Sequence, residues 1–120
     1  MIAPLRGTAS FELLRREGLR ARHGALSLVT RHDPTLTVPQ VAFSVPRSVG
    51  PAVTRNRLRR RLREILRSQS SAQQMPIGQH LLICRPEAAH LSFRELSDGV
   101  EHLFVSCRAK LSVTTGNHGA

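Results

Sequence analysis

Apolar positions between residues 51 and 68 recur at the spacing of an amphipathic helix. On a helical wheel they occupy a sector of about 100°, which is the width of a stripe that faces a protein core. Gly50 and Pro51 open the segment, and a proline with its preset φ is favourable at the first helical position. The pattern therefore predicts a helix over about 51–68, whose buried residues are Leu58, Leu62, Ile65 and Leu66.

Strand-like patterns occur on both sides of that helix. The segments 19–22, 25–30 and 38–45 alternate apolar residues with polar or small ones, which indicates strands with one face in the core. The segment 79–85 instead holds a continuous apolar run, which is typical of a strand covered on both faces. Three or four strands are therefore expected, and the last of them is the most deeply buried.

A short helix is predicted near the N-terminus. Thr8 or Ser10 can cap its start, because their hydroxyl groups can accept hydrogen bonds from the first free N–H groups. The helix is expected to run through about Arg16, with Phe11 on its apolar side, and Gly18 to end it.

The C-terminal part of the chain is also predicted to be helical. Ser92 and Glu95 have the spacing of a capping box, and apolar residues at helical spacing follow them. This pattern predicts a helix over about 92–110. Residues 112–120 are expected to be a disordered tail, so that the folded domain covers 1–111.

The predicted order is helix, two or three strands, helix, strand, helix. A strand, a helix and a covered strand in succession favour a parallel β-α-β unit within an otherwise antiparallel sheet. The chain of 120 residues is long enough for one domain with a modest core and too short for two. The sequence therefore predicts a single α+β domain, built as a sandwich of helices and a sheet.

Positive charge is concentrated on the predicted central helix. The chain has 18 Lys and Arg residues against 8 Asp and Glu, a net charge of +10, and seven of the arginines lie between residues 55 and 67. Like charges four residues apart each cost a few tenths of a kcal/mol without a partner, and only Glu64 offers a counter-charge within the helix. A binding site for a phosphate-rich polyanion is therefore favoured over a merely solvated face.

Several other classes of site and protein find no support in the sequence. Cys84 and Cys107 are far apart and form no CxxC pair, which fits a reducing cytosol, and the six histidines lack zinc-site spacing, so no metal site is expected. No stretch approaches the roughly 18 apolar residues that span a bilayer, so a cytoplasmic protein without membrane contact is expected. No catalytic triad motif or glycine-rich phosphate loop is present, so the chain is not expected to be a self-sufficient enzyme.

The segment 43–64 strongly resembles the signature of the bacterial ribonuclease P protein subunit. That family carries a strand ending in a basic residue, a Gly-x-Ala-Val step, the triplet Arg-Asn-Arg and a basic helix. Segments 81–86 and 91–96 resemble the family's fourth strand and the start of its last helix, and Phe11 stands where the family has an aromatic residue. The resemblance covers about residues 5–110 in the right order.

This resemblance implies an α-β-β-β-α-β-α sandwich with a left-handed β-α-β crossover, contrary to the usual right-handed rule. It also implies a subunit of an endoribonuclease whose RNA component removes the 5′ leader of precursor tRNA, which makes the mature tRNA 5′ end. On this interpretation the RNA is the catalyst, and Mg²⁺ is bound mainly by the RNA and the substrate. The protein is expected to be a monomer without catalytic residues that binds the catalytic RNA and positions the leader.

The resemblance also assigns roles to individual residues. Arg47 matches the basic residue at the end of the strand, and Phe11 matches an aromatic residue in the cleft that holds the leader. Arg15, Val29 and Ser44 are expected in the same cleft; since Arg15 and Val29 replace frequent aromatics, leader binding here should rely less on stacking and more on charge. The residues expected to contact RNA from the central helix are Arg55, Asn56, Arg57, Arg59, Arg60, Arg63 and Arg67.

Three alternatives remain open at this point. A structural protein that binds ribosomal RNA would carry the same charges, and only the context of the Arg-Asn-Arg triplet argues against it. A basic amphipathic helix lying on an anionic membrane is disfavoured, because its apolar stripe has no Trp or Phe and is needed for the core. A DNA-binding helix-turn-helix is disfavoured because no second helix precedes the basic one at short range.

Overall fold

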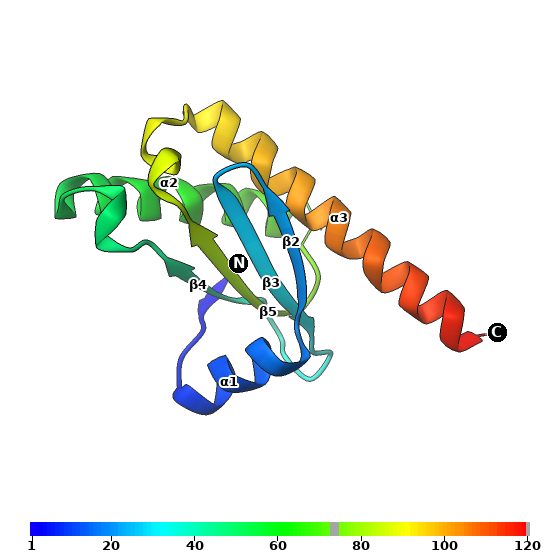
Figure 1. The fold of residues 1–120 in the computed structure, drawn as a ribbon. Coiled ribbons are helices and arrows are strands. Elements are labelled where there is room, and N and C mark those ends of the chain that lie inside the picture. The colour runs from blue at the N-terminus through cyan, green and yellow to red at the C-terminus, as the bar shows by residue number, and fades with distance from the viewer. Residues whose placement is uncertain (73–74, 120) are drawn as a thin grey trace.

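The strands of the chain build one mixed sheet with helices on both of its faces (Figure 1). The computed structural model describes residues 1–72 and 75–119, and side chains as far as residue 110. Its elements are β1 (Ala3–Pro4), α1 (Thr8–Glu17), β2 (Leu19–His23), β3 (Leu26–His32), β4 (Gln40–Ser44), α2 (Ala52–Ser71), β5 (Gly78–Cys84) and α3 (Phe93–Gly119), with 3₁₀ turns η1 (Arg47–Val49) and η2 (Pro86–His90).

The sheet has the strand order β1-β4-β5-β3-β2. β4 and β5 are parallel neighbours joined through α2, whereas β5 pairs antiparallel with β3, and β3 with β2. The predicted parallel β-α-β unit and the single α+β domain are therefore confirmed, but the rest of the sheet is not wholly antiparallel, because β1 also pairs in parallel with β4. The left handedness of the crossover stays a prediction.

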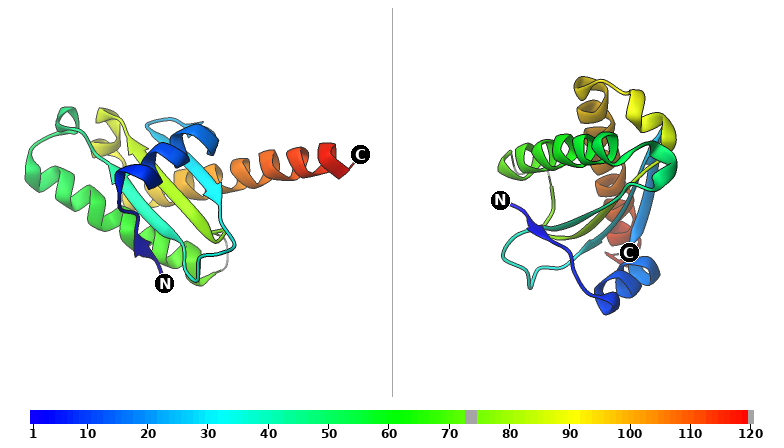
Figure 2. Two further views of the ribbon diagram at one scale, coloured as in Figure 1. Left: turned by 90° about the horizontal axis from the view of Figure 1, so that it is seen from below. Right: turned by 90° about the vertical axis from the view of Figure 1, so that its left-hand side faces the viewer.

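Alternation along the strands divides the interior into two layers. Helices α2 and α3 cover one face of the sheet and α1 covers part of the other (Figure 2). In β3, Leu28 faces α2 and α3, while Val29 packs with Leu5 and Leu14 under α1. In β5, Leu82 and Cys84 are buried against α2 and α3, whereas Leu81 and Ile83 on the α1 side are only partly buried, so the predicted cover is complete on one face and partial on the other.

Strand β1 was not predicted. It consists of Ala3 and Pro4, which pair in parallel with Gln40 and Val41 at the edge of the sheet. Two residues are too few to show an alternating pattern, and the pairing depends on a partner that is distant in the sequence. The observed order therefore begins with a strand before the α-β-β-β-α-β-α succession.

The predicted bounds of the central helix are wrong at both ends. Pro51 is the N-cap and not the first helical residue, because its ψ of 165° is extended; its carbonyl accepts a hydrogen bond from the N–H of Arg55 at 3.0 Å. The helix then continues through Ser71, three residues beyond the predicted end. There the Ser70 hydroxyl donates to the carbonyl of Met1 at 3.0 Å, a contact that sequence spacing does not reveal.

The capping box at the start of α3 is confirmed. The N–H of Ser92 donates to Glu95 Oε1 at 2.9 Å, and the N–H of Glu95 donates to Ser92 Oγ at 3.1 Å. Hydrogen bonds from the backbone N–H of Ser92 and from its side chain lower the pKa of the Glu95 carboxyl group. Helix α3 extends through Gly119 rather than ending near Lys110. The side chains of the predicted tail, 112–120, lie outside the described residues.

Candidate nucleic-acid interface

The turn before α2 fixes where the basic helix begins. Gly50 has φ +151° and ψ −172°, a backbone conformation that side-chain-bearing residues rarely adopt. Its carbonyl oxygen accepts a hydrogen bond from Arg55 Nε at 3.1 Å. The glycine thus sets the direction of the helix, and the first arginine of the signature is held against the turn.

One stripe of α2 is buried and the rest carries cations. Leu58, Leu62, Ile65 and Leu66 are all at most 4% exposed, which confirms the predicted core-facing residues. Arg55, Arg59 and Arg61 flank this stripe and are half-buried. The predicted RNA contacts that are exposed on this helix are Asn56, Arg57, Arg60, Arg63 and Arg67, and Glu64 is exposed among them.

The charges on this helix are not neutralised within the protein. Among the described residues, no arginine of α2 forms an ion pair. The ion pairs of that part of the chain join Arg16 to Glu17, and Arg31 to both Glu17 and Asp33. Within α2, Arg59 Nη1 donates to Asn56 Oδ1 at 3.1 Å, which aligns two signature side chains without removing charge. The helix therefore presents several uncompensated guanidinium groups, which can grip phosphates with two parallel hydrogen bonds.

The strand that precedes α2 contributes to the same region. The guanidinium carbon of Arg63 lies 5.8 Å from the centroid of the Phe43 ring, within the range of a cation–π contact. Arg47 is exposed in turn η1, between β4 and α2. The structure therefore brings the strand end and the basic helix together, as the signature predicts.

A second region of interest is the part of the sheet that α1 leaves uncovered. Helix α1 approaches β3 closely at Gly18, where a Cβ atom would meet Leu14 O at 2.4 Å and Val29 Cγ1 at 2.8 Å. Phe11 is half-buried and lines a shallow hollow together with exposed Arg15. Two of the predicted cleft residues therefore lie side by side on α1.

The other two predicted cleft residues lie on the sheet beneath. Val29 is only 1% exposed, because Leu5 and Leu14 pack over it. Its side chain supports α1, and it also lines the hollow of the open sheet described below, so its assignment to the cleft stays a prediction. Ser44 is half-buried in β4, and it pairs with Ile83 on the face that carries α1.

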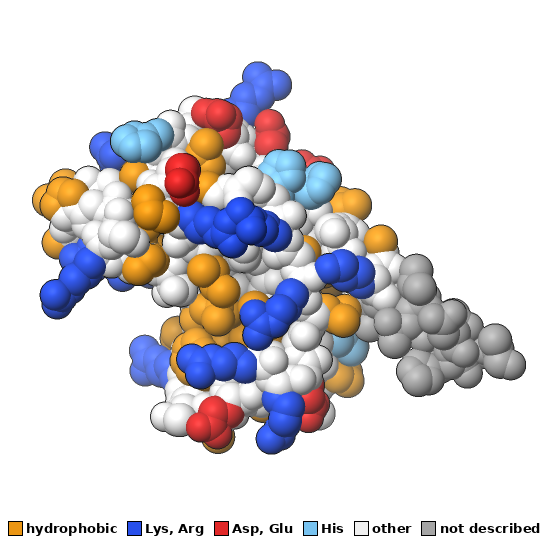
Figure 3. Space-filling model, in the orientation of Figure 1, with side chains coloured by type: hydrophobic (Ala, Val, Ile, Leu, Met, Phe, Trp, Pro, Cys, Tyr) orange, Lys and Arg blue, Asp and Glu red, His pale blue; other side chains and the backbone are white. Residues whose placement is uncertain are grey.

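Five further residues of this face were not predicted. Arg20 and Arg22 are exposed on either side of buried Ala21, and they line a hollow on the open sheet. Their spacing of two within a strand was the available signal, since alternate residues share a face. Figure 3 views this face and shows Lys and Arg side chains gathered around a central apolar strip. The remaining residues that line the hollow from this face are Ser27, Ile83 and Arg85.

The thiols of the two described cysteines are not activated as nucleophiles. Burial raises the pKa of the Cys84 thiol to about 11, although Arg59 opposes that shift, and burial also raises the pKa of Cys107. Among the described residues, no three His, Cys, Asp or Glu side chains are grouped so that they could hold a metal ion. In that same part of the chain, no helix has the length and apolar character needed to cross a membrane.

The chain is similar to known proteins over nearly its whole length. A family model described as Ribonuclease P matches residues 3–108. The ribonuclease P protein component of Thermobifida fusca is 36% identical over 108 residues, which cover 81% of this chain and 72% of that protein. The corresponding component of a Nocardioides species is 36% identical over 114 residues, which cover 90% of this chain and 93% of that protein.

Solved structures show the same fold. The ribonuclease P protein of Staphylococcus aureus superposes with a TM-score of 0.74 at 20% identity, covering 83% of this chain and 90% of that one. The ribonuclease P protein of Thermotoga maritima gives a TM-score of 0.72 at 24% identity, covering 84% and 94% of the two chains. At these identities the likeness concerns the fold alone.

Proposed function

Because the chain belongs to the ribonuclease P protein family, we propose that it binds the catalytic RNA of ribonuclease P through the outer face of α2. The observation that carries this proposal is the set of arginines on α2 that have no acidic partner among the described residues. Binding of phosphates by these groups releases condensed counterions and lowers the repulsion between RNA segments. The complex should therefore assemble at a lower Mg²⁺ concentration than the RNA needs alone.

The open face of the sheet is proposed to hold the 5′ leader of precursor tRNA. Phe11 offers one aromatic surface, and Arg15, Arg20 and Arg22 offer cations along the same side of the sheet. A single strand laid on such a surface is held by its backbone charge and by limited stacking, with little sequence preference. This arrangement fits a protein subunit that must accept leaders of many different sequences.

In this proposal the protein contributes no catalytic residue to leader removal. The described residues do not provide a cluster of carboxylates for Mg²⁺, so the metal is assigned to the RNA subunit and the substrate. The RNA subunit and the substrate supply oxygen ligands for Mg²⁺, and the arginine side chains of the protein reduce the repulsion between these two RNAs. A monomer of the protein suffices for this role, and its cytoplasmic location stays a prediction.

Reconstitution tests the proposal. The protein is added to bacterial ribonuclease P RNA and precursor tRNA at a low Mg²⁺ concentration, and removal of the leader is measured over time. Cleavage should be much faster than with RNA alone, and the difference should shrink at high Mg²⁺. If the folded protein gives no stimulation at low Mg²⁺, the proposed function is wrong. A ribosomal RNA fragment of equal length serves as the control for binding by charge alone.

A further inference from the structure

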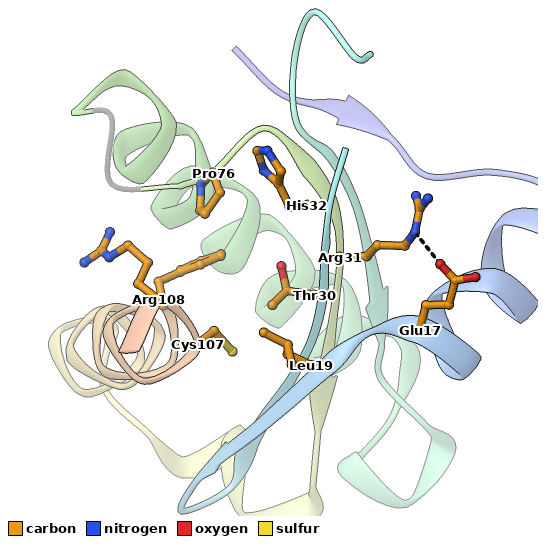
Figure 4. Close-up of a pocket in the computed structure, with 9 residues that line it drawn as sticks. Glu17, Leu19, Thr30, Arg31, His32, Pro76, Cys107 and Arg108 are labelled. Atoms are coloured by element: carbon orange, nitrogen blue, oxygen red, sulfur yellow. Dashed lines mark hydrogen bonds and ion pairs between the residues drawn. The ribbon is translucent and has the colours of Figure 1, made fainter. Parts of the chain in front are cut away.

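A cavity of about 350 Å³ lies between α3 and the ends of β2 and β3 (Figure 4). It is on the α3 side of the sheet, opposite the open face described above, and no residue of α2 lines it. Figure 4 shows Arg31 and Glu17 paired on the far side of β3, pointing away from α3. The remaining residues that line the cavity are Leu19, Thr30, His32, Pro76, Phe104, Cys107 and Arg108.

The hydrogen-bonding role of Thr30 is set by buried His80. His80 Nε2 lies 2.9 Å from the carbonyl oxygen of Pro76, which can only accept, so Nε2 carries the proton. Burial lowers the pKa of His80 to about 4, so the ring is neutral at pH 7 and its Nδ1 is an acceptor. Thr30 Oγ1 therefore donates to Nδ1 across 2.6 Å. With its one proton used, the Thr30 hydroxyl can only accept a hydrogen bond from a ligand.

The rest of the cavity wall near α3 is mainly apolar, with Arg108 and the exposed His32 at its edge. Leu19 and Phe104 provide carbon surface, and burial raises the pKa of Cys107, so its thiol is a neutral part of the wall. Arg108 is half-buried, lines the cavity and already takes part in an interaction within the protein; its guanidinium group lies on the side of α3 away from Thr30 and Leu19 (Figure 4). A flat apolar ligand with an N–H donor and a negative charge would match these three features.

We propose that this cavity binds a single unpaired nucleotide, with its base among the apolar side chains and its phosphate toward Arg108. The volume falls within the usual range for small-molecule sites, about 300–1,000 Å³. RNA-binding proteins commonly take splayed-out bases into such pockets, where an N–H on the base edge meets a protein acceptor. The net charge of +10 also raises the local concentration of an anionic ligand. This inference does not depend on the proposed function.

The test is a titration of the ¹⁵N-labelled full chain with adenosine monophosphate, followed by NMR chemical shifts. Saturable shifts are expected at the amides of Leu19, Thr30, Phe104 and Cys107. Adenosine should shift the same amides with at least fivefold weaker affinity, and inorganic phosphate should leave them unchanged. Each ligand is used alone, so that the contributions of base and phosphate are measured separately.

Two variants and one matched control decide the result. Arg108→Gln should weaken binding of adenosine monophosphate at least fivefold, whereas Arg94→Gln, on an exposed turn of the same helix, should leave it unchanged. Cys107→Phe fills the cavity and should abolish the shifts; if it does not fold, the two arginine variants decide. The absence of saturable shifts at these amides would overturn the proposal. An equal effect of phosphate alone, or of Arg94→Gln and Arg108→Gln, would do the same.

Discussion

The guanidinium group of Arg63 lies over the ring of Phe43, 5.8 Å from its centroid, and ties α2 to β4. A contact of this kind near the surface contributes about 0.5–1 kcal/mol. A double-mutant cycle with Phe43→Leu and Arg63→Gln should therefore give a coupling of that size in the free energy of unfolding, measured by urea denaturation. Strictly additive single effects would show that the two side chains do not stabilise each other.

Removing charge from the outer face of α2 should change the salt dependence of RNA binding. Arg59→Gln with Arg60→Gln removes two cations that have no acidic partner among the described residues. The slope of log K against log salt concentration is negative. Each lost phosphate contact should reduce its magnitude by about 1, so the pair should reduce it by about 2. Affinity for ribonuclease P RNA is measured by filter binding over a range of salt concentrations.

A matched control separates this effect from the change in net charge. Arg60→Gln alone should reduce the magnitude of the slope by about 1, while Arg94→Gln, an equally exposed arginine on α3, should leave it unchanged. Equal slopes for these two variants would mean that RNA binding follows total charge and does not use α2 specifically.

The open sheet face should hold the leader mainly by charge. Phe11→Leu keeps an apolar side chain in place, and we expect it to weaken binding of leader-bearing precursor tRNA by less than about threefold. Arg20→Gln with Arg22→Gln should weaken it by about tenfold at low salt and little at high salt. Mature tRNA, which lacks a leader, serves as the control substrate. A loss for Phe11→Leu as large as that of the arginine pair would show that stacking dominates.

Burial of His80 should make the fold less stable in mild acid. Its pKa is lowered from 6.5 to about 4 in the folded protein, so the unfolded chain takes up a proton first as the pH falls. The free energy of unfolding should then decrease by about 2 kcal/mol between pH 7 and pH 5, and level off only below the folded pKa. Urea denaturation at several pH values measures this decrease.

His80→Gln provides the comparison for that experiment. It removes the titrating ring, so its free energy of unfolding should depend less on pH between 7 and 5, even though the variant is less stable at pH 7. A variant with the same pH dependence as the original chain would assign the acid sensitivity to other groups.

Local patterns predicted the central part of this fold well. The stripe of four apolar residues on α2 repeats within a few helical turns, so its burial follows from helix geometry whatever the rest of the chain does. The capping box of Ser92 and Glu95 is equally local, and both of its hydrogen bonds form. The bounds of α2 were less predictable, because Ser70 meets Met1 from the opposite end of the chain.

The candidate site was predictable on the helix and much less so on the sheet. Alternation in β3 shows that Val29 and Leu28 point to opposite faces, but it does not show that α1 lies directly on Val29. No binding role was predicted for the arginines of β2, because exposed charges on a strand are common. Only the sheet order, with β2 at the edge beside β3, places them around a hollow.

The two edges of the sheet also bear on how the free protein behaves at high concentration. One edge is β1, a strand of two residues that includes Pro4, and the other is β2, with Arg20 and Arg22. A short proline-containing strand has few N–H groups to offer, and repeated cations repel a second copy that approaches in register. Both edges therefore resist strand addition between molecules, so we expect the free, highly basic protein to stay in solution at high concentration without forming intermolecular sheets.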